Sequence, residues 1–291
     1  MADAALAGSV TTRRYVVLLS FIGLVLLAAA LRAAYRWWRR RPPAPAAQAR
    51  FSGDLPPAVT AYTAALAVGA LASLRAGDVL DTVGCRRPRG TIKRELRLAA
   101  EPYRQSVLGE EDVSTAIGRC VNDLLGPSAE TVGGPLAPIE EVIRHRRRGG
   151  PELWPHAIDE WAARATLSEK SVAALHETAG DITRAEEELR RTGVLGANEY
   201  VPSLLAVHWG RGVHLTRGAI RVGWLDRTRG LNYLRRAGEL AARWYPTPGT
   251  MLAAQLLPAY LSEDPAARRW AETTAPQLLT DPRSPLATPR R

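Results

Sequence analysis

The sequence predicts a mainly α-helical protein with a single N-terminal transmembrane helix, a small helical accessory region and a C-terminal helical domain. An uncharged apolar run lies near the N-terminus, apolar residues recur at helical spacing through most of the remaining chain, and stretches rich in proline or glycine separate these parts. The expected parts are a tail at 1–14, a transmembrane helix at 15–35, a basic, Pro-rich juxtamembrane linker at 36–57, the accessory region at 58–125, a second linker at 126–151, the helical domain at 152–286 and a disordered tail at 287–291.

The positive charge of the chain is concentrated near its N-terminus. The 291 residues carry a formal net charge of +10, and residues 1–50 contain eight arginines against one acidic residue. The excess charge therefore belongs to the membrane-proximal segment, which disfavours nucleic acid as a partner of the folded part. The two cysteines, Cys85 and Cys120, show no metal-binding spacing, although a single bridge between them stays open.

Residues 15–31 form the uncharged run, and Arg13 and Arg14 precede it. A helix of this length rises roughly 25 Å, and the alanines that follow extend it toward the ~30 Å hydrocarbon core. Membrane-interface residues come next: Arg36, Trp37, Trp38, Arg39, Arg40 and Arg41. More arginines follow the run than precede it, so the positive-inside rule predicts a single-pass cell-membrane protein with a cytoplasmic C-terminal region. A signal peptide cleaved near residue 30 is the alternative.

The accessory region begins with residues 58–74, whose alanine and threonine content favours a soluble helix over a second membrane span. Residues 78–83 and 91–98 are expected to form a short hairpin, and residues 112–125 a helix with one apolar face. Helix, wing and helix would suit a DNA-binding unit whose loop touches phosphate through Arg86, Arg87, Arg89 and Lys93. Only one helix precedes the supposed wing, so a helical accessory region is preferred.

The second boundary follows a short helix at 139–143. A basic run at 144–148 leads into Gly149-Gly150-Pro151, which is typical of a solvated linker; contact with anionic lipid is the alternative. After it, Trp154, Ile158 and Trp161 share one helical face, and the sequence from Thr166 to Glu169 fits a capping box that opens the next helix.

Residues 201–261 are expected to form two helices and the start of a third. Gly223 and Trp224 make the corner between the first two, and Asp226 is placed to be the N-cap of the second. Because a tryptophan at such a corner offers a large apolar surface, we expect Trp224 to be largely buried between the two helices. Pro246 and Pro248 end the second helix.

Five segments of this region carry a family resemblance: residues 206–211 (Ala-Val-His-Trp-Gly-Arg), 215–217 (Leu-Thr-Arg), 223–225 (Gly-Trp-Leu), 243–246 (Arg-Trp-Tyr-Pro) and 278–285. From roughly 153 to 286 the chain resembles a bacterial family catalogued as domain of unknown function 1266. It departs from the family pattern at His208, where an Asp is usual, and at Leu286, where a Trp is usual. The resemblance implies a helical fold and brings no settled activity.

The sequence contains no Gly-x-Ser-x-Gly, His-Glu-x-x-His or P-loop pattern, and it predicts neither a cofactor nor a metal site. The preferred interpretation is a membrane-anchored, non-enzymatic interaction or regulatory module, with the lipid bilayer and a protein as partners. The alternative is a small-molecule-binding or enzymatic domain with a polar pocket around His208, Arg211 and Arg217. His208 and Arg211 lie one turn apart and could bind a phosphate or carboxylate, or form a polar pair at a helix contact.

Overall fold

The computed structural model describes residues 48–53, 61–106, 109–110, 112–126, 136–146, 151–165, 167–273 and 275–287. Residues 45–291 form one compact unit. The predicted transmembrane helix at 15–35 lies outside the described residues. So do its interface residues Arg36, Trp37, Trp38, Arg39, Arg40 and Arg41. Among the residues that are described, no helix has the length and apolar character needed to cross a membrane.

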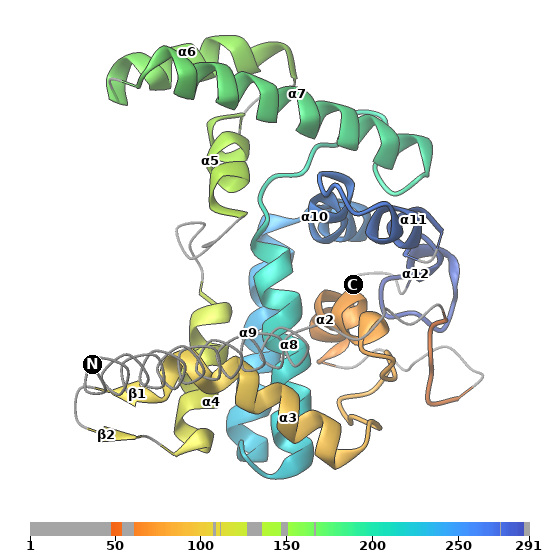
Figure 1. Cartoon of the computed structure of the whole chain (residues 1–291). Helices are drawn as coiled ribbons and strands as arrows, with labels where there is room; N and C mark the ends of the chain where they lie inside the picture. Colours follow the sequence, from red (N-terminus) through yellow and green to blue (C-terminus); the bar gives the residue numbers. More distant parts are fainter. Residues whose placement is uncertain are drawn as a thin grey trace, which may run out of the picture. The chain divides into compact units, whose positions relative to one another are not determined.

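The described part is mainly α-helical, which confirms the predicted fold class at that level (Figure 1). Its helices are α2 (Thr63–Arg75), α3 (Arg89–Ala100), α4 (Val113–Leu124), α5 (Ala137–Arg146), α6 (Trp154–Ala165), α7 (Glu169–Arg191), α8 (Leu205–Val222), α9 (Arg227–Trp244), α10 (Pro248–Tyr260), α11 (Pro265–Thr273) and α12 (Gln277–Thr280). Short 3₁₀ turns span Glu101–Tyr103 and Pro151–Leu153. Strands β1 (Gln105–Ser106) and β2 (Gly109–Glu110) pair antiparallel, with Gln105 opposite Glu110.

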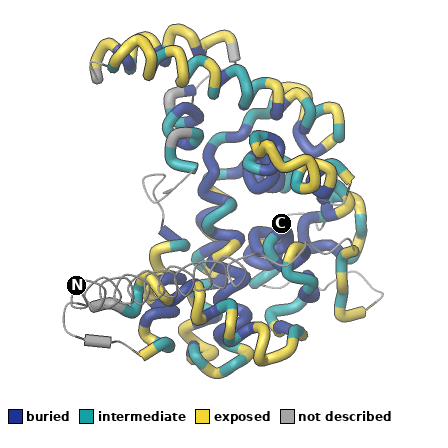
Figure 2. Tube along the Cα trace, in the orientation of Figure 1, coloured by how far each residue is buried: buried dark blue, intermediate teal, exposed yellow. Residues whose placement is uncertain are grey.

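Helix α2 lies at the centre of the core and packs against both α8 and α9. Figure 2 shows α2 and α8 largely in the colour of buried residues. The helices approach closely where glycine leaves room: a Cβ at Gly69 would lie 2.4 Å from Val213 Cγ1, and one at Gly210 would lie 3.0 Å from the Val68 carbonyl oxygen. This contact therefore requires glycine on both helices. Of the segment predicted to be helical at 58–74, the residues from Thr63 onward form the buried helix α2, which extends to Arg75.

The accessory region and the region with the family resemblance share one hydrophobic core. Helices α3 and α4 also pack against α8, and buried side chains such as Val68 (α2), Ile117 (α4) and Leu205 (α8) belong to a single cluster. The linker predicted at 126–151 therefore connects two stretches of sequence whose side chains pack together. Helix α5 lies within that predicted linker.

Residues 91–98 form part of helix α3, so the predicted hairpin, and with it the wing of a DNA-binding unit, is wrong. Ile92, Leu96, Ala99 and Ala100 are buried on one side of α3. This spacing of three to four residues matches a helix and not the alternation of a strand. Pro88 at the N-cap position starts the helix with the restricted backbone that proline imposes.

The N-terminal caps of α4 and α7 test two predictions, of which the first is confirmed and the second is wrong. Asp112 caps α4 by accepting a hydrogen bond from the Ser114 amide, which agrees with the helix predicted at 112–125. The N-cap of α7 is Ser168, whose hydroxyl accepts from the Ser171 amide. The capping box predicted to start at Thr166 is therefore wrong, because the helix begins two residues later than that pattern requires.

The corner between α8 and α9 has the expected backbone but a different buried residue. Gly223 has φ +79°, a left-handed conformation that favours glycine. Asp226 caps α9 by accepting hydrogen bonds from the amides of the second and third helical residues. Leu225 is buried, whereas Trp224 is only half-buried and lies under the Arg97 guanidinium of α3, 5.7 Å from its ring centroid. The prediction of a largely buried Trp224 is wrong, because the corner turns its ring toward α3.

Candidate functional site

The three residues of the predicted polar pocket do not converge. His208 is half-buried, Arg211 is exposed, and Arg217 is 1% exposed in the interior. His208 and Arg211 lie one turn apart on α8. Arg217 follows nine residues after His208, which is roughly half a revolution around the helix axis. His208, Arg211 and Arg217 therefore do not line a common pocket.

His208 is poorly suited to hold an anion. Its Nε2 atom is buried and has no hydrogen-bond partner among the described residues. Burial, and then the nearby Arg211 guanidinium, lower the pKa of His208 below its ordinary value of 6.5. The imidazole is therefore neutral at neutral pH, and a neutral ring offers an anion no charge.

Arg217 holds three chain segments together. Its Nη1 atom donates to Ser73 Oγ at 2.6 Å, and its Nη2 atom donates to the carbonyl oxygens of Val79 at 2.7 Å and Gly84 at 3.0 Å. Burial lowers the pKa of Arg217, while the Asp78 carboxylate acts in the opposite direction. The side chain thus connects α8 to the end of α2 and to the α2–α3 connection.

A network of charged groups that the sequence did not reveal lies beside Arg217. Arg87 Nη1 lies 2.7 Å from Glu95 Oε2, and His214 Nε2 lies 3.0 Å from both Glu95 Oε1 and Arg87 Nη2. Burial disfavours the charged carboxylate, but the hydrogen bonds and charges of His214 and Arg87 prevail and lower the pKa of Glu95 to about 2. The predicted hairpin gave no indication of this network, because the side chains of Arg87 and Glu95 approach each other only when α3 is a helix.

Asp78 fixes the loop that carries Arg87. Its Oδ1 atom accepts hydrogen bonds from the amides of Val79 and Arg86, both at 2.9 Å, and its Oδ2 atom lies 3.7 Å from Arg87 Nε. Burial alone would lower the pKa of Arg87, but the adjacent Glu95 carboxylate outweighs burial and raises it. Arg87 is therefore a charged, oriented side chain.

A cavity of about 540 Å³ opens in front of this network. Its lining residues are Arg50, Phe51, Ala76, Gly77, Val79, Arg86, Arg87, Pro88 and Thr91. Every charged residue in the lining is an arginine. Arg50 and Phe51 form one wall. The Leu80 amide donates to the Arg50 carbonyl oxygen, and the amide of the adjacent Ser52 donates to Asp81, so both bonds hold this wall in place. We call this the arginine cavity.

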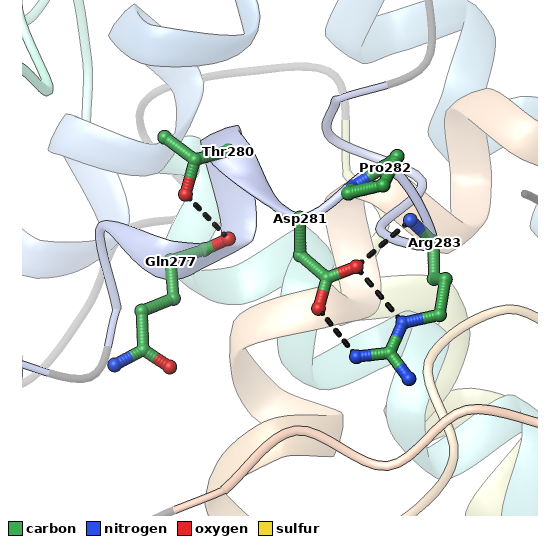
Figure 3. A pocket seen from close by; sticks show the side chains of 5 residues that line it. All are labelled: Gln277, Thr280, Asp281, Pro282 and Arg283. Atoms are coloured by element: carbon green, nitrogen blue, oxygen red, sulfur yellow. Dashed lines mark hydrogen bonds and ion pairs between the residues drawn. The ribbon is translucent and has the colours of Figure 1, made fainter. Parts of the chain in front are cut away.

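A second hollow, of about 470 Å³, lies at the closing segment of the chain (Figure 3). It is lined by Gln277, Thr280, Asp281, Pro282 and Arg283. Figure 3 shows Arg283 directed at Asp281, to which its Nε and Nη2 atoms donate at 3.0 and 2.8 Å. The two charges offset each other. Arg283 also lies 4.5 Å from the centroid of the Phe51 ring, so this segment supports the wall of the arginine cavity.

The described residues offer little for metal or thiol chemistry. Within them, no group of three or more His, Cys, Asp or Glu side chains is arranged to hold a metal ion. Cys85 and Cys120 are both buried and free, so the disulfide left open by the sequence does not form. Burial raises the pKa of both thiols, to about 11 for Cys120, which keeps them protonated at neutral pH.

Helix α5 supplies a carboxylate to the start of α8. Leu204, at the N-cap position of α8, provides no side-chain cap. Instead, Glu140 of α5 accepts hydrogen bonds from the Leu204 amide at 2.6 Å and from the Ser203 hydroxyl at 2.8 Å. The negative charge lies at the helix end where the dipole favours it.

Comparison with known proteins matches the C-terminal part of this unit. The sequence model of a family described as "Protein of unknown function (DUF1266)" matches residues 139–289, just over half of the chain. The match begins earlier than the resemblance predicted from residue 153 and takes in α5 with Glu140. No curated protein and no solved structure matches the chain. The chain belongs to the DUF1266 family of proteins of unknown function.

Proposed function

We propose that this protein is a membrane-anchored, non-enzymatic module whose helical unit lies in the cytoplasm and acts by binding a protein partner. The observation that carries the proposal is the position of the family-signature side chains. Trp209, Arg217 and Tyr245 are the three largest of the fully buried side chains. These three signature residues lie in the core and support a role in holding the fold. The signature residues His208, Arg211 and Trp224 are half-buried or exposed. His208 and Arg211 do not converge on a cavity with Arg217, as the residues of a catalytic signature would.

The polar side-chain atoms of Trp209 and Tyr245 bond within the protein. Trp209 Nε1 donates to the Gly126 carbonyl oxygen at 2.9 Å. The Tyr245 hydroxyl donates to the Ser203 carbonyl oxygen at 2.7 Å and accepts from the Ala206 amide at 2.9 Å. The Trp209 and Tyr245 rings meet edge to face, with centroids 6.0 Å apart. These contacts join the start of α8 to the end of α9 and leave the signature no outward-facing polar group at these positions.

The membrane part of the proposal rests on residues 15–35 and on the arginines that follow them. We expect a reporter that is active only in the cytoplasm to be active when fused to Arg291, and one that requires export to be silent. The chain should remain with the membrane fraction after a salt wash. Replacing Arg36, Arg39, Arg40 and Arg41 with asparagine should raise the activity of the exported reporter, because it removes the positive charge that retains this side in the cytoplasm.

A silent cytoplasmic reporter on the unaltered chain, or a mature chain that begins near residue 31, would overturn the anchor. If the anchor holds, crosslinking in intact cells followed by purification from detergent-solubilised membranes tests the partner. A protein partner should be recovered in fixed proportion with the full chain. Recovery of the chain alone under several crosslinkers would count against the interaction role.

One observation favours a second function, the binding of a small anion. The sequence-based alternative placed a polar pocket at His208, Arg211 and Arg217, which do not converge. The arginine cavity lies instead beside the α2–α3 connection and adjoins the segment that Arg217 fixes. Its volume of about 540 Å³ falls within the roughly 300–1,000 Å³ typical of ligand sites.

A further inference from the structure

We propose that the arginine cavity binds a phosphate group, either free or carried by a phospholipid headgroup. The inference deepens the second function proposed above and does not depend on the anchor. It rests on the charge of the lining, on the rigidity of one of its arginines and on the helix end that opens into it.

Two of the three arginines in the lining carry a charge that no described carboxylate offsets. Arg50 and Arg86 are exposed, and neither forms an ion pair with a described carboxylate. Each guanidinium presents its donors in a planar fork that matches two oxygens of a phosphate. Two such groups at one cavity repel each other without an anion, and an anion bound between them would relieve that repulsion.

Arg87 gives the cavity a fixed base. Its side chain is 9% exposed and is oriented by Glu95 and Asp78 on the inner side. Its Nε atom is buried, lies 3.7 Å from Asp78 Oδ2 and forms no hydrogen bond with a described residue. Because Arg87 is already ordered, an anion that reaches it loses little affinity to the ordering of that side chain.

The N-terminus of α3 opens on the same cavity. Pro88 is the N-cap residue of this 12-residue helix and provides no side-chain hydrogen bond, and Pro88 and Thr91 both line the cavity. The amides of the first helical turn therefore have no side-chain cap at the end where the helix dipole favours negative charge. Phosphate groups bind at helix ends of this kind when positive groups lie nearby, and Arg50 and Arg86 line the same cavity.

Phosphate fits these groups better than the other anionic partners. A carboxylate presents two oxygens, whereas phosphate presents three or four to donors that come from three directions. An extended nucleic acid would need a basic surface longer than one cavity. The predicted wing would have extended that surface, but residues 91–98 are helical and form no wing. Phe51 adds an apolar wall for whatever the phosphate is attached to.

The lining residues can bind the phosphate group of either source, because both present the same oxygens. The experiment therefore has to separate a free phosphate from a phospholipid headgroup.

The test is calorimetric titration of the full-length chain, in micelles of an uncharged detergent, with inorganic phosphate. We expect saturable binding with one site per chain. Arg50→Ala and Arg86→Ala should each weaken the affinity at least tenfold, since each removes a guanidinium from the lining. Arg243→Ala removes the same charge from an exposed position at the end of α9 and should leave the affinity unchanged. No saturable binding, or an equal loss in all three variants, would overturn the proposal.

The second arm identifies the source. One of two short-chain lipids is added to the same micelles. Phosphatidic acid carries a phosphate monoester, and phosphatidylcholine is the neutral control. If the lipid occupies the cavity, phosphatidic acid alone lowers the apparent affinity for inorganic phosphate, and Arg86→Ala abolishes the effect. If the ligand is soluble, both lipids leave the affinity unchanged. Either outcome supports the site. The titration measures binding at the cavity whether or not the chain spans a membrane. A negative result in the reporter experiment therefore leaves this inference standing, and absence of phosphate binding leaves the anchor standing.

Discussion

Replacing Arg217 with alanine should lower the free energy of unfolding by about 3–5 kcal/mol, a large fraction of the roughly 5–15 kcal/mol that stabilises a domain. The substitution removes three hydrogen bonds at once and leaves the buried acceptors of Ser73 and Val79, and the carbonyl oxygen of the exposed Gly84, without their donor. It also removes a positive charge near the Asp78 carboxylate. Denaturant melts that compare the midpoint and slope of the variant with those of the unaltered chain measure the loss.

Two variants serve as controls for Arg217. Arg211→Ala removes an exposed arginine from the same helix and should change the stability by no more than about 0.5 kcal/mol. Trp224→Ala removes a half-buried ring and should cost less than the roughly 3–5 kcal/mol of a buried tryptophan. The order follows from the burial of Arg217 and the partial exposure of Trp224. A Trp224 variant that destabilises the chain more than the Arg217 variant would contradict the structural role given to the arginine.

A second large effect is expected at the buried ion pair of Arg146 and Glu186. The pair is bidentate, with N–O distances of 2.7 and 2.6 Å, and both side chains are almost fully buried. Glu186 also accepts from the Val201 amide, and Arg146 donates to the Val201 carbonyl oxygen. Arg146→Ala should cost about 3–5 kcal/mol, because it leaves a buried carboxylate without its partner. Thermal and denaturant melts of the purified full-length chain check the value.

Helix α7 provides the matched control for this pair. Arg184 pairs with Asp181 on the exposed side of the same helix, where both side chains are open to solvent. Arg184→Ala should cost no more than about 1 kcal/mol. Replacing both buried partners, as Arg146→Met with Glu186→Leu, should recover part of the loss, because it removes both charges together. If the buried and exposed arginine variants lose the same stability, Arg146 does not hold α5 against α7.

The sequence predicted the elements whose signal is local. The Ala-rich segment at 58–74 indicated a soluble helix and became α2, and Asp112 and Asp226 cap the helices that follow them. The hairpin failed because 91–98 was judged by strand propensity, although Ile92 and Leu96 have helical spacing. The basic run at 144–148 was expected to be solvated, yet Arg146 is buried, since its partner Glu186 lies 40 residues away in the sequence.

The candidate site was less predictable, because its contacts are distant in the sequence. Arg217 bonds to a carbonyl oxygen 138 residues away, so nothing around it in the sequence indicates that it is buried. The arginine cavity joins residues 50–51 to residues 76–91. Arg86 and Arg87 were recognised as phosphate-binding candidates only through the DNA-binding alternative, which the structure of α3 contradicts. Two adjacent arginines in a loop do not indicate that a third arginine, distant in the sequence, lies beside them.

The central claim is that the helices before the family region belong to the same cooperative unit as the signature helix α8. Native-state hydrogen exchange of the full-length chain in detergent micelles tests it most directly. The amides of α2, at 66–74, should exchange with the same opening free energy as those of α8, at 209–219, and this free energy should equal that of global unfolding. Exchange of the α2 amides at a much lower opening free energy, while α8 stays protected, would show that the two regions unfold independently and would contradict the claim.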